Sequence, residues 1–241
     1  MTERKQVILL DSDDGAVEIR IRRSTRARRM RLLLRPGEPM VTLVLPSGTD
    51  ERRGRAFAER ERSWIMARLA ERDLPVAFAD GAEIPYLGRP HAIRHLGERR
   101  GVVRLEEDRI VVPGDPAHLP RRVGDWLRGQ ARAAVSPLAL DFAARLDRRV
   151  TGISIRDQRS RWASCSSSGR LNFSWRLILT PPEILRYVVA HEVSHLVEMN
   201  HSPRFWAVVG RLDPGYRKAR DWLRRNGPAL HRFGGHPDGA D

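Results

Sequence analysis

The residues most able to do chemistry lie in one short stretch, His191-Glu192-Val193-Ser194-His195, which is followed by His201. On a helix, positions i and i+4 lie one turn apart on the same face, so His191 and His195 can share one metal ion. Two imidazoles at this spacing bind zinc, and Glu192 then lies beside the metal as a proton acceptor. The motif therefore predicts a zinc-dependent hydrolase that uses activated water.

His201 is the expected third ligand, but only if the helix ends before it. In a straight helix its Cα would lie about 15 Å beyond that of His191, which is too far to share an ion. Asn200 tolerates the left-handed conformation that ends helices. Ser202 and Pro203 supply an N-cap and a first-turn proline for a new helix. Three imidazoles with one open coordination position are typical of a catalytic zinc site, with one Zn²⁺ per chain.

Four further side chains are candidates for supporting roles. Glu198 lies seven residues after His191, too far along the helix to be a comfortable ligand, so we expect it outside the ligand shell or in a salt bridge. A second donor normally stabilises the oxyanion in carbonyl hydrolysis. Arg161, Arg176 and Tyr216 are candidates for that role, and the sequence does not choose among them.

The elements that must position these residues can be placed from capping and periodicity. Residues 180–183, Thr-Pro-Pro-Glu, predict a helix over 181–199 with Thr180 as N-cap and Glu183 closing a capping box. A strand is expected over 170–179, and its part from 170 to 177 is the expected edge strand that pairs with an extended peptide. A helix is expected over 119–146, with Pro137 as a possible kink.

The N-terminal half is predicted to be rich in β-structure. Residues 17–22 alternate apolar and charged side chains, as a half-buried strand does. Further strands are expected at 31–34, 40–45, 83–96 and 102–112, and one helix at 50–73. The two prolines and the glycine in residues 113–116 suggest a boundary. The sequence thus predicts an α+β fold with a β-rich part over 16–115, a catalytic part over 116–226 and a mobile tail over 227–241.

Composition restricts the partners and the compartment. The chain has 241 residues and a net charge of +14, and among its 44 basic residues only Lys5 and Lys218 are lysines. Codon bias explains the preference for arginine but not the excess of basic over acidic residues. A positive field favours anionic partners, so nucleic acid is a possible one. The single Cys165 and the lack of a long apolar run predict a cytoplasmic protein without membrane association.

Several segments around the motif carry a family resemblance. They closely resemble the YgjP-like metallopeptidase family, which is related to SprT-type and other zincin proteases. That resemblance implies a zincin fold with an active-site helix beside a small sheet, zinc held by His191, His195 and His201, and Glu192 as the base. Ala163 stands where the family usually has glycine. The matching segments are residues 161–166 (RWASCS), 171–177 (LNFSWRL), 187–192 (YVVAHE), 200–202 (NHS) and Phe205-Trp206.

Two other functions remain open beside cleavage of peptide bonds. Zinc-activated water can also attack phosphorus, and the net charge suits a polyanion, so a pyrophosphatase acting on nucleoside triphosphates is one alternative. The chain has no GxxxxGK[ST] loop and no carboxylate cluster for magnesium, which argues against it. The second alternative is a basic nucleic-acid-associated module with a structural zinc. Glu192 argues against that one, because a structural site needs no base.

Overall fold

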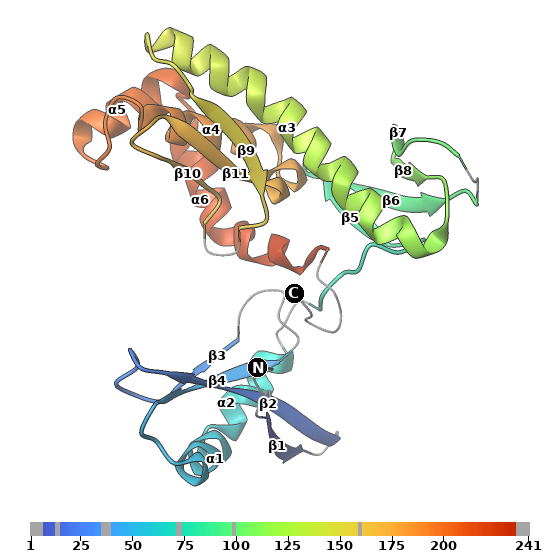
Figure 1. The fold of residues 1–241 in the computed structure, drawn as a ribbon, viewed down its shortest axis with the longest axis vertical. Helices are drawn as coiled ribbons and strands as arrows, with labels where there is room; N and C mark the ends of the chain where they lie inside the picture. The colour runs from blue at the N-terminus through green and yellow to red at the C-terminus, as the bar shows by residue number, and fades with distance from the viewer. Residues whose placement is uncertain are drawn as a thin grey trace. The chain divides into compact units, whose positions relative to one another are not determined.

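The computed structural model describes residues 7–12, 15–34, 40–70, 74–97, 100–158 and 161–234. The protein is a mixed α+β structure, as the sequence predicts. It divides into two compact units, the first within residues 1–75 and the second formed by Val76–Gly234 (Figure 1). Each unit has a hydrophobic core of its own. The division therefore falls at residue 75, well before the residues 113–116 at which the sequence suggests a boundary.

The first unit is a four-stranded sheet covered on one face by two helices. The strands β1 (Val7–Ser12), β2 (Gly15–Ser24), β3 (Arg31–Leu33) and β4 (Val41–Pro46) lie in the order β1-β2-β4-β3. Ile19, Ile21, Leu43 and Leu45 alternate onto the face that packs against α1 (Glu51–Arg60) and α2 (Arg62–Ala70). The predicted strands are confirmed, whereas the single helix expected over 50–73 is interrupted at Glu61, and residues 71–73 lie outside the described ranges.

The second unit begins with a sheet whose apolar side chains pack in the same core as the residues around the predicted metal ligands. Its strands β5 (Glu83–Tyr86), β6 (Arg89–His95), β7 (Arg104–Glu106) and β8 (Arg109–Val112) lie in the order β5-β6-β8-β7. Ile93 and Ile110 of this sheet share a core with α3 (Leu119–Arg145), which continues through Pro137 without a break. Figure 1 shows α3 running from this sheet toward the second one. The prolines of residues 113–116 therefore mark the approach to a helix, not the end of a domain.

The second sheet of this unit differs from the prediction in one important respect. Its strands β9 (Gly152–Arg156), β10 (Ala163–Cys165) and β11 (Arg170–Ser174) lie in the order β10-β11-β9. Ser174 then caps a 3-10 helix, η2 (Trp175–Leu179), by accepting a hydrogen bond from the Arg176 N–H at 3.3 Å. The prediction of an edge strand over 170–177 is thus wrong. β11 is central and hydrogen-bonded on both sides, and β10 is an edge.

Three helices and a 3-10 turn complete the unit: α4 (Pro182–Ser194), α5 (Pro203–Leu212), α6 (Tyr216–Asn226) and η3 (Gly227–Arg232). The prediction of a mobile tail from residue 227 fails as far as residue 234, because Leu230 and Phe233 are each only 8% exposed in the core. Residues 235–241 lie outside the described ranges. Within those ranges, every helix is too short or too polar to cross a membrane.

The two ends of the second unit are hydrogen-bonded to each other. Val76 donates its N–H to the Arg232 carbonyl at 2.9 Å and accepts one from Gly234 at 3.0 Å. Gly234 has φ +71°, and a Cβ added there would lie only 2.7 Å from the Phe78 ring. Glycine is therefore required by both conformation and space, since other residues rarely adopt positive φ. These contacts close the unit where it begins.

Candidate metal centre

Helix α4 carries the first two histidines and Glu192. Its first turn contains Pro182. Proline has no N–H, but it loses no hydrogen bond here, because N–H groups in the first turn of a helix have no acceptor within the helix. The N-cap is Pro181, not the predicted Thr180, whose hydroxyl bonds the Leu177 and Pro181 carbonyls instead. The apolar side chains that fix the helix in the core are Ile184, Leu185, Val188, Val189 and Val193.

The helix ends five residues earlier than the sequence predicts. The Ser194 hydroxyl donates to the Ala190 carbonyl at 2.7 Å, and the His195 N–H then bonds to the Glu192 carbonyl at 3.2 Å, three residues back. This tighter spacing is typical of a helix terminus. The chain therefore begins to turn at His195, the C-cap, and the ring of His201 can approach the helix again. Asn200 is not among the described residues with positive φ, so it does not end the helix in the predicted way.

The tight turn also orients the His195 ring. Nδ1 of His195 lies 3.1 Å from the backbone carbonyl of Glu198. Because a carbonyl only accepts, Nδ1 must carry the proton, which leaves the lone pair of Nε2 for a metal. Glu198 thus orients His195 through its main-chain carbonyl and not through its carboxylate.

His201 completes the group from the start of the next helix. Ser202 is the N-cap of α5 and accepts a hydrogen bond from the Phe205 N–H at 3.3 Å, which confirms the predicted helix start. Nε2 of His201 lies 3.1 Å from Nε2 of His191. One ligand atom from each of the three histidines lies within 4.8 Å of the others. The structure therefore brings together all three histidines singled out in the sequence.

The spacing of His191 and His201 and the protonation of His191 and His195 suit a zinc ion. Two nitrogens bound to one tetrahedral zinc at ~2.0–2.1 Å lie about 3.3–3.4 Å apart, close to the observed 3.1 Å. Burial is the main cause that lowers the pKa of His191 to about 3, and His195 and His201 lower it further. Burial also lowers the pKa of His195. Ligation requires neutral imidazole, and the protein environment favours that form.

Glu192 is a buried carboxyl group placed beside these rings. It is 7% exposed, and burial raises its pKa to about 7, while Arg161 and a backbone hydrogen bond from Cys165 act in the opposite direction. A carboxyl with a pKa near neutrality can both accept and return a proton. The neighbouring Cys165 has its pKa raised to about 11, mainly by burial, so it is a protonated thiol and not a reactive thiolate.

One residue that the sequence did not single out as functional forms a common support for the ligands. Phe205 is fully buried, and its ring centroid lies 4.9 Å from that of His191, 4.5 Å from His195 and 4.7 Å from His201. The Trp206 ring also contacts His191 and His201, with centroid distances of 5.7 and 6.0 Å. The available signals were its position three residues after the Ser202 cap, which indicates a buried first turn, and its place in the family resemblance. Neither indicates which rings Phe205 contacts.

Phe205→Ala is expected to destabilise the second unit by about 3–5 kcal/mol, the usual cost of removing a buried phenyl ring. It should also weaken zinc binding by about 10–100-fold, as loss of other supporting groups does, because all three rings lose a shared contact. Urea unfolding and competition with a fluorescent zinc chelator measure the two effects. Phe205→Leu, which keeps most of the volume, is the matched control and should show smaller losses. Unchanged zinc affinity in Phe205→Ala would contradict the supporting role.

The three candidates for oxyanion stabilisation have different surroundings. Arg161 is exposed, and its charge lowers the pKa of Glu192. Arg176 is 3% exposed, forms an ion pair with Asp157 and donates to the Phe233 carbonyl at 3.3 Å. Tyr216 stacks on Trp206 with ring centroids 5.5 Å apart. Arg161 therefore remains the candidate whose charge acts directly on Glu192. Arg176 is engaged in an ion pair with Asp157. Tyr216 contacts Trp206, and Trp206 in turn contacts His191 and His201.

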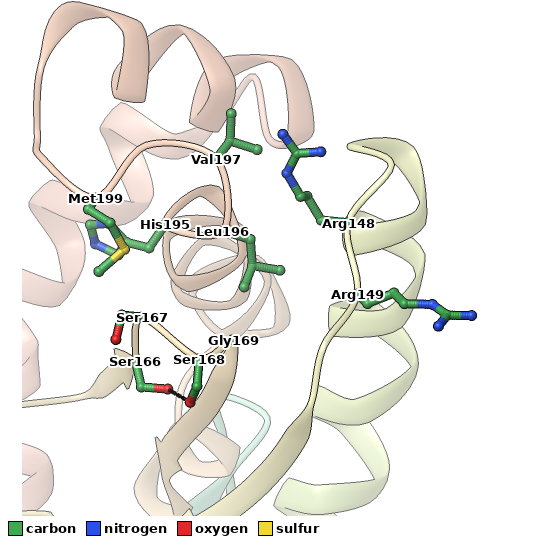
Figure 2. A pocket seen from close by; sticks show the side chains of 10 residues that line it. All are labelled: Arg148, Arg149, Ser166, Ser167, Ser168, Gly169, His195, Leu196, Val197 and Met199. Atoms are coloured by element: carbon green, nitrogen blue, oxygen red, sulfur yellow. Dashed lines mark hydrogen bonds between the residues drawn. The ribbon is translucent and has the colours of Figure 1, made fainter.

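A cavity of about 300 Å³ adjoins His195. It lies between the β10–β11 hairpin loop (residues 166–169), the turn after α4 (residues 195–199) and two arginines that follow α3, Arg148 and Arg149. Figure 2 shows Arg148 extending toward Val197, whereas Arg149 points away from the other labelled side chains. The cavity therefore combines serine hydroxyls, a positive charge and apolar surface beside the predicted metal ligands.

Comparisons with known proteins place the chain in a family. The YgjP-like, metallopeptidase domain family model matches residues 28–226, which include every residue of the centre described above. One similar solved structure is the crystal structure of the metallopeptidase zymogen of Pyrococcus abyssi abylysin, with 25% identity over 41% of this chain and 97% of that chain, at a TM-score of 0.35. No curated protein gives a significant match. Because the family model covers most of its length, the chain belongs to the YgjP-like metallopeptidase family.

Proposed function

We propose that the protein is a zinc-dependent peptidase in which His191, His195 and His201 hold the metal and Glu192 is the general base. The observation that carries this proposal is the meeting of three imidazole nitrogens within 4.8 Å of one another beside a buried carboxyl. Three imidazoles leave a tetrahedral ion one open position, which a hydrolase needs and a structural site lacks. Membership in a metallopeptidase family supports the same conclusion.

The protein's own groups supply proton transfer and charge. Zinc held by the three histidines would lower the pKa of water and polarise the scissile carbonyl. A carboxylate oxygen of Glu192 accepts the proton of the attacking water and returns it to the departing amine, and burial, which raises the pKa of this carboxyl, makes it a stronger base. Arg161, whose charge already acts on Glu192, is the candidate that opposes the negative charge developing on the carbonyl oxygen.

The substrate would bind as an added strand on β10. Ser164 pairs with Asn172 of β11. The Ser166 N–H donates to the Arg170 carbonyl, and the Trp162 carbonyl accepts from the Ser174 N–H, so these groups also face β11. Alternation along the strand then directs the backbone groups of Ala163 and Cys165 outward, on the side of Glu192. Since Glu192 already accepts the Cys165 N–H, an extended peptide would pair with the remaining outward groups and pass the site with alternate side chains facing the protein. The neighbouring cavity, with Arg148 at its rim, would favour an acidic side chain.

The test is digestion of a defined peptide mixture by the zinc-loaded full-length protein, with products identified by mass spectrometry. We expect cleavage that stops when a chelator removes the metal, with acidic side chains enriched near the cleaved bond. Arg148→Glu should remove that enrichment, whereas Arg149→Glu, whose side chain points away, should change it less. Absence of zinc-dependent cleavage would contradict the proposed function. Cleavage without acidic preference would contradict only the assignment of the cavity.

A further inference from the structure

A second cavity lies in the first unit and is lined largely by arginine. It has a volume of about 490 Å³ and lies over β2, the β2–β3 connection, β3 and β4. Arg22 of β2, Arg26, Arg28 and Arg29 of the connection, and Arg31 of β3 all line it. All five side chains are exposed. No part of this cavity belongs to the metal centre, so an inference from it is independent of the proposed function.

The arginines occupy the face of the sheet opposite to the core of the first unit. Strand alternation places Ile21 of β2 on the core face and Arg22 on the other. In β4, Leu43 belongs to the core, whereas Val44 lines the cavity and is 5% exposed. Helices α1 and α2 pack on the core face. The opposite face thus carries a basic cavity with apolar surface beneath it, where arginine stems can lie while their charged ends face solvent.

The local charge is not balanced by carboxylates. Residues 19–37 contain eight arginines and no aspartate or glutamate. Within the described ranges, no ion pair joins any of the five cavity arginines to a carboxylate. Some arginines elsewhere do pair, such as Arg121 and Arg128, which both pair with Asp125. A preference for arginine codons explains the choice of arginine over lysine but not the lack of carboxylates in residues 19–37. Five guanidinium groups that repel one another are stabilised by a bound polyanion.

We propose that this arginine cavity binds the phosphate backbone of nucleic acid. Planar guanidinium groups match phosphate oxygens in pairs, which makes arginine the preferred residue for such contacts. Five of them spread over three successive elements suit consecutive phosphates of one strand, more than a single phosphate could engage. The lining contains no aromatic side chain on which bases could stack, so binding should be independent of sequence.

The test is binding of the full-length protein to a short fluorescent DNA duplex, measured by anisotropy at several salt concentrations. If all five arginines contact phosphates, the logarithm of the association constant should fall with the logarithm of salt with a slope of about −4.5, since each contact contributes about −0.9. Replacing Arg22, Arg28 and Arg31 with glutamine should make the slope less steep by about 2.7. At about 0.1 M salt this corresponds to a loss of affinity of roughly 500-fold relative to the extrapolation at 1 M.

The matched control replaces Arg52, Arg53 and Arg55 of α1 with glutamine, which removes the same charge from exposed positions of the same unit. This control should keep most of the salt slope. Equal loss in both triple variants would overturn the proposal, because net charge alone would then explain binding. Two further results would also overturn it: equally tight binding of polyglutamate, or complete displacement of the DNA by millimolar inorganic phosphate. Circular dichroism of each variant verifies that the fold is retained.

Discussion

Glu192→Gln is expected to reduce peptide hydrolysis by about 10²–10⁴-fold while zinc remains bound at one ion per chain. The substitution keeps the shape of a side chain that is 7% exposed and removes its ability to accept a proton, a contribution of this size in general-base catalysis. Peptide turnover and metal content by mass spectrometry measure the two quantities separately. Loss of activity with the metal retained distinguishes a catalytic base from a metal ligand.

Glu198→Gln is the matched control for this substitution. Glu198 orients His195 through its backbone carbonyl, so a change in its side chain should leave turnover nearly unaltered. Wild-type turnover in Glu192→Gln would contradict the role of the base. Release of pyrophosphate from nucleoside triphosphates, with no cleavage of any peptide, would instead identify the phosphohydrolase alternative.

Glu192→Gln should also stabilise the metal-free protein at neutral and higher pH. Burial raises the pKa of Glu192 from 4.5 to about 7, so the folded state binds a proton that the unfolded state has released. The contribution of Glu192 to the free energy of unfolding is fully present below pH 4.5 and is lost as the pH rises to about 7. The free energy of unfolding changes over this range by about 3 kcal/mol at most. Glutamine does not titrate, so the variant should lack this part of the pH dependence in urea unfolding.

His191→Gln is expected to abolish stoichiometric zinc binding and the stabilisation that zinc confers. With zinc at about 1,000 times its dissociation constant, the wild-type protein gains about 4 kcal/mol of unfolding free energy, and the variant should gain almost none. Thermal unfolding with and without zinc, together with chelator competition, measures the change. His191 should have a larger effect than His201, because the His191 ring is more buried whereas His201 is exposed.

His118→Gln is the control, because His118 is an exposed histidine outside the metal centre whose side chain makes no capping hydrogen bond. It should bind zinc as the wild-type protein does. If the His191 and His118 variants retained zinc with equal affinity, the metal would have to bind elsewhere, and the proposed ligand set would be wrong.

The parts of the site that depend on local spacing could be predicted from the sequence. Helical periodicity places His191 and His195 on one face, and the Ser202-Pro203 pair starts the helix that brings back His201. Both are properties of a few consecutive residues. The end of α4 was placed too late because the Ser194 hydroxyl and the tighter bond at His195 compete with helix continuation, and no residue type there indicates this strongly.

The parts that depend on pairing between distant segments could not be predicted. Whether β11 is central or an edge depends on β9 and β10 and is not encoded in its own alternation. The boundary suggested at residues 113–116 has typical linker composition, but Ile93 and Ile110 on its N-terminal side pack in the same core as α3. The Phe205 support arises because one ring from α4 and two from the turn between α4 and α5 converge on it. Such convergence is visible only in three dimensions.

The hydrogen bonds between Val76 and the segment from Arg232 to Gly234 affect when the catalytic unit can be completed in the cell. A chain emerges from the ribosome from its N-terminus, and the segments that join the first and last residues of a unit become available last. Here the segment that closes on Val76 is the last part of the unit to be synthesised, and Phe233 enters the same core as the metal-bearing helix. The unit therefore cannot finish folding until residues 232–234 have emerged from the ribosome.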